Sequence, residues 1–200
     1  MTEVTGYILI GGASRRMGTD KSKLVFGSLT LAERAAVVLD KIADSVKVVG
    51  GSLEGWETVP DRNATDTRAS IYGMHAALAD CRTEWAAVLA CDMPFVSANL
   101  FQVLLAETDR PNTDAVVPVQ PDGRPQPLAA IYRTSRCLPV VESLIFSGEL
   151  RLTSMFEKLD TVFLQPPQYG LVENLSHHFL NVNTPDDLRL AEEIAERFDE

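Results

Sequence analysis

The feature that most constrains the fold is a glycine-rich loop between an apolar segment and an amphipathic segment. The loop runs from Gly11 to Lys21 and follows the apolar run 7–10, which predicts a buried strand. Residues 29–42 carry apolar side chains at helical spacing, which predicts an amphipathic helix. The loop therefore lies at the carboxyl end of a strand, where open α/β sheets bind their ligands.

The composition of this loop favours a phosphate site. Glycines let the backbone approach a ligand closely, and successive backbone N–H groups can form a concave anion site. Residues 11–24 contain four basic side chains and one acid, Asp20. The alternative is a flexible turn whose arginines are solvated. Because glycines, strand and positive charge coincide, we expect a polyphosphate site, although neither the P-loop nor the dinucleotide-binding pattern is present.

Strand and helix patterns alternate along the chain. Further strands are expected at 45–49, 59–61, 85–90, 115–119, 128–132, 161–164 and 179–183. Further helices are expected at 71–79, 98–107, 138–146 and 185–197. We therefore expect one domain over residues 1–200, an α/β fold with a mostly parallel sheet in a three-layer α/β/α sandwich. The segment 115–132 is expected to add an antiparallel pair over one edge.

Charge and composition exclude several classes of function. The net charge of −10 argues against nucleic acid as a partner, because phosphate-backbone binding needs a basic face. There is no apolar run of membrane-spanning length and no N-terminal signal pattern, so a cytoplasmic location without a membrane partner is expected. Three widely spaced cysteines without a C-x-x-C pair indicate reduced, structural residues.

Asp92 is a candidate metal ligand. It follows the apolar run 85–90 almost directly, so it lies at the same edge of the sheet as the glycine-rich loop. A carboxylate there can hold Mg²⁺, which takes one or two carboxylates together with substrate phosphates. The alternative is a turn aspartate before Pro94, but the neighbouring loop favours the metal.

A third pattern lies near the C-terminus. Asn181 and Asn183 are expected on one face of a strand, because strand residues alternate. They precede Thr184-Pro185-Asp186-Asp187, which has the cap residue, proline and first-turn acids of a helix start. The asparagines either bind a ligand or bridge backbone groups at this helix start.

The loop resembles the L-x-G-G-x-S-x-R-M-G-x-D-K signature of the molybdenum cofactor guanylyltransferase family. The match comprises Leu9, Gly11, Gly12, Ser14, Arg16, Met17, Gly18, Asp20 and Lys21. Cys91-Asp92-Met93-Pro94-Phe95 and the N-x-N-T-P-x-D-L motif also resemble family motifs. The resemblance covers most of the chain and implies a Rossmann-like nucleotide-diphospho-sugar transferase architecture.

The resemblance implies transfer of GMP from GTP to molybdopterin or its molybdenum-loaded form, with Mg²⁺ as cofactor and pyrophosphate as the second product. Catalytic roles fall on Lys21 at the α-phosphate, on Arg16 at the β- and γ-phosphates, and on Asp92 as metal ligand. The implied nucleotide-binding residues are Leu9, Ile10, Gly11, Gly12, Ser14, Gly18, Lys21, Asp61, Gly73 and Asp92. Asn181 and Asn183 lie near the metal or the acceptor in this family. Lys21 is expected in an exposed loop.

The chain departs from the family pattern at several positions. Ile10 replaces an alanine, Gly50 or Gly51 replaces an asparagine after the second strand, and Ala69-Ser70 replaces a Gly-Pro pair. Asp61 and Asp66 are both candidates for the base or ribose contact, and the spacing to Gly73 favours Asp61. A related cytidylyltransferase, a sugar-phosphate nucleotidyltransferase and a non-catalytic nucleotide- or cofactor-binding protein remain alternatives. We expect a monomer with transient contacts to other cofactor-biosynthesis proteins or acceptor enzymes.

Overall fold

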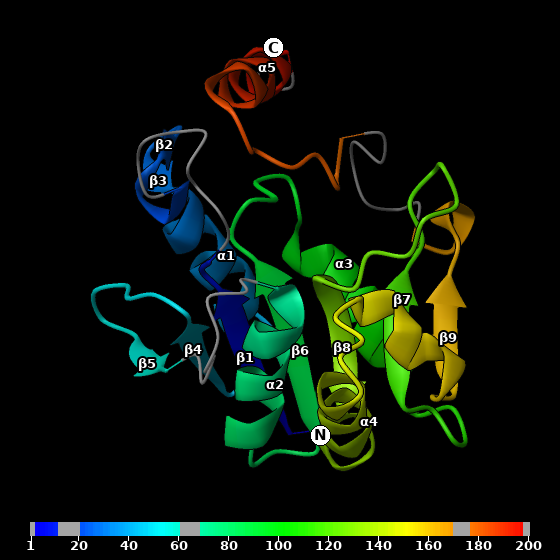
Figure 1. Ribbon diagram of the computed structural model, residues 1–200. Helices are drawn as coiled ribbons and strands as arrows, with labels where there is room; N and C mark the ends of the chain where they lie inside the picture. The colour runs from blue at the N-terminus through cyan, green and yellow to red at the C-terminus, as the bar shows by residue number, and fades with distance from the viewer. Residues whose placement is uncertain (1–2, 12–20, 61–68, 170–176, 198–200) are drawn as a thin grey trace.

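A seven-stranded sheet forms the centre of the protein, in a computed structural model that describes residues 3–11, 21–60, 69–169 and 177–197 (Figure 1). Its strands are β1 (Val4–Leu9), β4 (Ser45–Val49), β5 (Glu57–Val59), β6 (Trp85–Ala90), β7 (Ala115–Pro118), β8 (Ala129–Arg133) and β9 (Thr161–Leu164). The order across the sheet is β5-β4-β1-β6-β8-β7-β9. The α/β prediction is therefore confirmed.

Only β8 runs antiparallel to its neighbours in this sheet, and it lies inside the sheet. It pairs antiparallel with both β6 and β7, whereas β9 pairs parallel with β7 and forms the edge. The antiparallel pair expected over one edge is thus present, but between β6 and β9. Its position depends on pairing between distant segments, which local sequence patterns do not specify.

Helices cover both faces of the sheet, as the three-layer prediction requires (Figure 1). The helices are α1 (Leu31–Asp40), α2 (Ser70–Asp80), α3 (Ala98–Ala106), α4 (Thr134–Phe146) and α5 (Pro185–Glu196). One buried cluster joins α1 and α3 to alternate strand residues such as Ile8 and Leu89. A second joins α2 and α4 to the intervening residues, such as Tyr7 and Val88. Among the helices of the described residues, none is long and apolar enough to cross a membrane.

A small hairpin and the last helix form a third cluster beside the carboxyl ends of the strands. The hairpin consists of β2 (Val25–Phe26) and β3 (Leu29–Thr30), and short 3-10 helices lie at Lys21–Lys23, Leu152–Glu157 and Pro166–Gln168. Phe26 and Leu31 are buried with Val182 and Ala191, the latter from α5. The ring of Phe95 meets Phe26 edge-on, with centroids 5.5 Å apart. This cluster joins the N-terminal and C-terminal parts of the chain.

Capping chemistry sets the start of α1, whereas α4 begins without a side-chain cap. The helix predicted from residue 29 starts at Leu31, because the Thr30 hydroxyl accepts from the Glu33 N–H and the Glu33 carboxylate accepts from the Thr30 N–H. In contrast, α4 starts at Thr134 rather than at 138, so Pro139 lies inside the helix. A helix beginning at 138 would hold this proline in its first turn, where a missing N–H costs nothing.

The segment 179–183 is not a strand, contrary to the sequence prediction. It runs outside the sheet, and the Val182 N–H donates to the Asp92 carbonyl at 2.8 Å. Burial nevertheless alternates over residues 180–183, since Leu180 is partly buried, Asn181 is exposed, Val182 is buried and Asn183 is exposed. The period-two pattern therefore reflects packing on the Phe26 cluster and not membership of the sheet.

Candidate active site

The centre of the sheet is arranged to bring two candidate site segments together. β1 pairs parallel with β4 on one side and with β6 on the other. The chain crosses from one side to the other at this point, so the β1–β6 pair is the switch point where open α/β sheets bind ligands. The Cys91 N–H donates to the Leu9 carbonyl at 3.2 Å, which holds the chain after β6 against the end of β1.

The residues at the end of β1 present backbone to this edge. Leu9 and Ile10 are buried at 8% and 5% exposure, so their side chains belong to the core. Gly11 is exposed, with open space where a Cβ would lie. A nucleotide contact by Leu9 or Ile10 would therefore use the main chain. The predicted site residues Gly12, Ser14, Arg16, Gly18 and Asp61 lie outside the described residues.

Lys21 meets the C-terminal motif. Lys21 is the first residue of the 3-10 helix at Lys21–Lys23. It is half-buried, whereas the sequence predicts an exposed loop residue. Its Nζ donates to Asn183 Oδ1 at 2.6 Å. Within the described part of the chain, no carboxylate lies within ion-pair distance of this ammonium group. The contact joins two motifs that are 162 residues apart in sequence.

Asp92 has the features of a cation ligand. It is partly buried in the turn after β6. Burial raises the pKa of Asp92, and the positive charge of Lys21 partly opposes that increase, so the two side chains share one electrostatic environment. Among the described residues no basic group forms a salt bridge with this carboxylate. A partly desolvated carboxylate without a counter-ion is stabilised when it binds a cation.

A single carboxylate such as Asp92 suits Mg²⁺ better than a transition metal. The described ranges contain no group of three or more His, Cys, Asp or Glu side chains placed to hold a metal. Mg²⁺ keeps several waters and takes one or two carboxylates plus substrate phosphates, so one aspartate is a sufficient protein contribution. The donor set therefore suits a cation that arrives together with a polyphosphate.

The other predicted site residues are placed differently from Asn183. Asn181 turns to its own backbone, where Nδ2 donates to the Phe179 carbonyl at 3.3 Å. Gly73 lies within α2, and a Cβ there would sit 3.7 Å from the Leu9 methyl groups, an ordinary contact. Thus only Asn183 of the two asparagines joins Lys21, and packing does not require glycine at position 73.

Two departures from the family pattern pack against each other. A Cβ on Gly51 would lie 2.6 Å from Cγ2 of Ile10, so the larger residue at position 10 leaves no room for a side chain at position 51. Gly50 has φ of +79°, a conformation that asparagine also adopts more readily than most residues. A side chain at position 51 would therefore have to displace Ile10.

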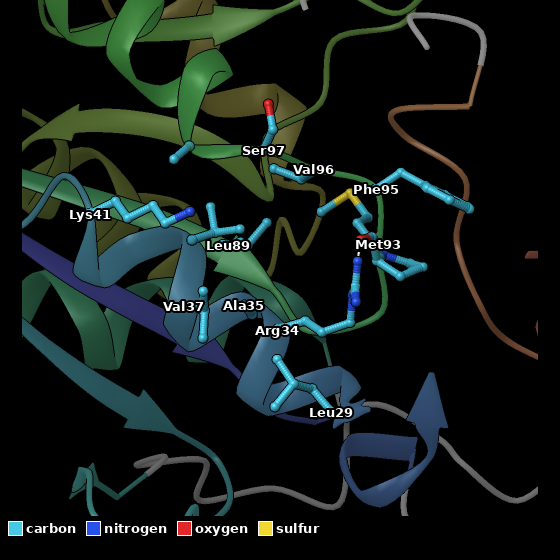
Figure 2. A pocket seen from close by; sticks show the side chains of 13 residues that line it. Leu29, Arg34, Ala35, Val37, Lys41, Leu89, Met93, Phe95, Val96 and Ser97 are labelled. Atoms are coloured by element: carbon cyan, nitrogen blue, oxygen red, sulfur yellow. Dashed lines mark hydrogen bonds between the residues drawn. The ribbon is translucent and has the colours of Figure 1, made fainter. Parts of the chain in front are cut away.

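The turn that carries Asp92 is supported from the α1 side. A groove of about 320 Å³ runs between α1 and residues 93–98, with Arg34 and Lys41 on one wall (Figure 2). The Arg34 guanidinium points toward Met93 and Phe95, donates from Nε to the Pro94 carbonyl at 3.4 Å and lies over the Phe26 ring. Arg34 thus ties the segment after Asp92 to α1 and to the Phe26 cluster.

Sequence reasoning missed His178, which packs behind this turn. Its side chain is buried at 1% exposure, and Nε2 accepts from the Ser97 N–H at 3.3 Å. Its Nδ1 has no hydrogen-bond partner among the residues that the structure describes, and burial lowers the pKa of His178 to about 4. No local pattern marks this histidine, because its partner is 81 residues away. It holds the start of α3 against the segment 177–183.

Comparisons with known proteins agree on one family. The profile of the MobA-like NTP transferase domain matches residues 6–162. The chain is 30% identical to a molybdenum cofactor guanylyltransferase from Desulfosudis oleivorans, covering 96% of each chain. It is 34% identical to a probable molybdenum cofactor guanylyltransferase from Deinococcus radiodurans, over 94% of this chain and 93% of the relative.

Solved structures show the same architecture. A molybdopterin-guanine dinucleotide biosynthesis protein A from Archaeoglobus fulgidus superposes with a TM-score of 0.80 at 28% identity, covering 96% of this chain and 99% of that one. A 2-C-methyl-D-erythritol 4-phosphate cytidylyltransferase from Thermus thermophilus superposes with a TM-score of 0.68 at 19% identity, covering 98% and 100%. The second likeness concerns the fold alone.

We predict that His178 makes the fold acid-sensitive. Its pKa is depressed in the folded state, so below about 6.5 the unfolded chain binds a proton that the folded chain excludes. The contribution of His178 is therefore present above pH 6.5 and lost as the pH falls toward 4, by at most about 1.4 kcal/mol per pH unit. Urea titrations at pH 7, 6 and 5 measure this loss.

His178→Gln keeps an acceptor for the Ser97 N–H and should flatten this pH dependence. His75→Gln is the matched control, because His75 is partly exposed and contacts only Glu142 at 3.5 Å among the described ion pairs. A His178→Gln variant with the wild-type pH slope would contradict the assignment.

Proposed function

The chain belongs to the MobA-like NTP transferase family, and we propose that it transfers GMP from GTP to the terminal phosphate of molybdopterin or of its molybdenum-loaded form. The relatives of about 30% identity over nearly the full length are named for this reaction. The observation that carries the proposal is the hydrogen bond from Lys21 to Asn183, whose neighbour Val182 is bonded to Asp92 beside the β1–β6 switch point. A cation and a half-buried ammonium group suit the triphosphate of a nucleotide.

The reaction needs positioning and charge neutralisation rather than a general base. A phosphate oxygen of the acceptor attacks the α-phosphorus of GTP, and the bond between this phosphorus and the oxygen of the β-phosphate breaks to release pyrophosphate. The nucleophile is already anionic, so no proton has to be removed. Fixed positive groups near the α-phosphate stabilise the charge that develops in the transition state.

The residues of this chain divide these tasks. Lys21 would donate to the α-phosphate, and Arg16 and the backbone of Gly11–Gly12 would hold the β- and γ-phosphates. Asp92 would hold Mg²⁺, which supplies Lewis-acid charge for the departing pyrophosphate. Asn183 Oδ1 accepts the hydrogen bond from Lys21, so the Nδ2 group of Asn183 would donate to the acceptor phosphate. Asp61 and Gly73 would line the nucleoside side of the site.

The proposal extends to domain organisation, location and partners. We propose one catalytic domain over residues 1–200, acting in the cytoplasm as a monomer that meets other cofactor-biosynthesis proteins transiently. The net charge of −10 supports a partner set without nucleic acid or membrane. A cytidylyltransferase shares the fold, but the relatives named for guanylyl transfer are nearer in sequence. A non-catalytic nucleotide-binding protein would release no pyrophosphate from GTP, so an assay of pyrophosphate release separates it from the proposed enzyme.

Replacing the lysine tests the catalytic role. Lys21→Ala should reduce GTP-dependent pyrophosphate release by roughly 10²- to 10³-fold, the loss typical of removing one donor to a charge-developing oxygen. Because Lys21 is half-buried and its ammonium group bonds, among the described residues, to one exposed side chain, the melting temperature should change little. Lys23→Ala, on the same short helix and exposed, is the control. Near-full turnover of Lys21→Ala would eliminate the catalytic assignment.

Replacing the aspartate tests the metal role. Asp92→Asn keeps the shape of the side chain but removes the charge that holds a hard cation, so activity and its Mg²⁺ titration should be lost together. The expected loss of Mg²⁺ affinity is measured by calorimetry with GTP present. Asp122→Asn is a control at an exposed carboxylate paired with Arg124. An active Asp92→Asn variant with an unchanged Mg²⁺ titration would rule out the metal role.

A further inference from the structure

We propose that Asp187 is a positioning residue for Lys21, acting through Asn183, and this inference rests on the nucleotidyl transfer proposed above. Asp187 is the third residue of α5, where a capping-box acid accepts the N–H of the cap residue. Here its Oδ2 accepts the N–H of Thr184 and also that of Asn183, each at 2.8 Å. The second bond goes beyond what the helix cap needs and fixes the backbone of Asn183.

The other side of Asn183 is fixed as well. The Val182 N–H donates to the Asp92 carbonyl at 2.8 Å, and the Val182 side chain is fully buried with Phe26 and Leu31. Asn183 is thus held between the turn that carries Asp92 and the first turn of α5. Only its side chain extends to solvent, and that side chain accepts the hydrogen bond from Lys21.

Electrostatics support the same connection. Hydrogen bonds from Asn183 and Thr184 and the charge of Lys21 lower the pKa of Asp187, against the opposing effect of its partial burial. Lys21 also opposes the increase of the Asp92 pKa. The ammonium group therefore lies in the field of two carboxylates that belong to distant parts of the chain.

This arrangement prepares Lys21 for a phosphate. A lysine side chain has many rotamers, and its ammonium group has three donors. One donor is used by Asn183, which leaves two for phosphate oxygens. Ordering the lysine before the nucleotide binds reduces the entropy that must be lost on the way to the transition state. Asp187 would thereby affect turnover more than nucleotide affinity.

Two variants at the same helix start separate positioning from simple capping. Asp187→Ala removes the acceptor for both N–H groups. Thr184→Ala removes only the hydroxyl that accepts from the Asp187 N–H at 3.1 Å and leaves the bond between Asp187 and Asn183. Both variants weaken the cap of α5, so both should lower the melting temperature. Asp186→Asn controls for charge, since Asp186 is exposed and its ion pair in the described part of the chain is with Arg189.

The experiment measures kcat and KM for GTP below the melting transition of every variant. We expect kcat of Asp187→Ala to fall about 10- to 100-fold, as for other displacements of a catalytic group, with KM changed less than about threefold. Asp187→Asn, which keeps an acceptor oxygen, should recover part of kcat. Thr184→Ala and Asp186→Asn should keep kcat within about twofold. Asp187→Ala combined with Asn183→Ala should lose little more than Asn183→Ala alone, because Asp187 acts through Asn183.

A wild-type kcat in Asp187→Ala, or an equal loss in Thr184→Ala, would overturn the proposal. An inactive wild type would instead contradict the proposed function, and a second readout separates the two cases. The NMR signal of the Lys21 ammonium group in the nucleotide-free protein should shift in Asp187→Ala and Asn183→Ala but not in Thr184→Ala. An unshifted signal in Asp187→Ala would also overturn the proposal.

Discussion

The parallel pairing of β1 with β4 and β6 is the constraint on which the site depends. It places the carboxyl ends of three strands at one edge, so that Gly11 and Asp92 follow neighbouring strands. The strands in this centre are almost wholly apolar because helices cover both faces. Asp92 lies just beyond the end of β6, where the strand leaves this apolar centre, and the charge of Lys21 acts on it there.

The C-terminal segment completes this edge from outside the sheet. Val182 is tied to the backbone of Asp92, and α5 packs on the same cluster as the hairpin and α1. Arg34 and His178 fix the turn after β6 from two further directions. The edge that carries the candidate site is thus assembled from three distant parts of the chain, and its geometry depends on contacts made at the level of the whole fold.

Sequence patterns predicted the parts of this assembly that are locally encoded. The β6 strand, the cap at Ser97 and the start of α5 at Thr184 were correct, because apolar runs and capping residues act within a few positions. The placement of β8, the short hairpin and the partner of His178 were not predictable, since each depends on pairing between distant segments. The contact between Lys21 and Asn183 belongs to the second group, although the two motifs were found separately. The roles assigned to Arg16 and Asp61 stay predictions.

The most direct test of the central claim is the identity of the product. Purified protein is incubated with molybdopterin, Mg²⁺ and an equimolar mixture of GTP and CTP, and the products are separated and identified by mass spectrometry. The account predicts the guanine dinucleotide with one pyrophosphate released per product, because a site built on hydrogen bonds to one base rejects a base that leaves them unpaired. Equal amounts of guanine and cytosine dinucleotides, or neither product, would contradict it.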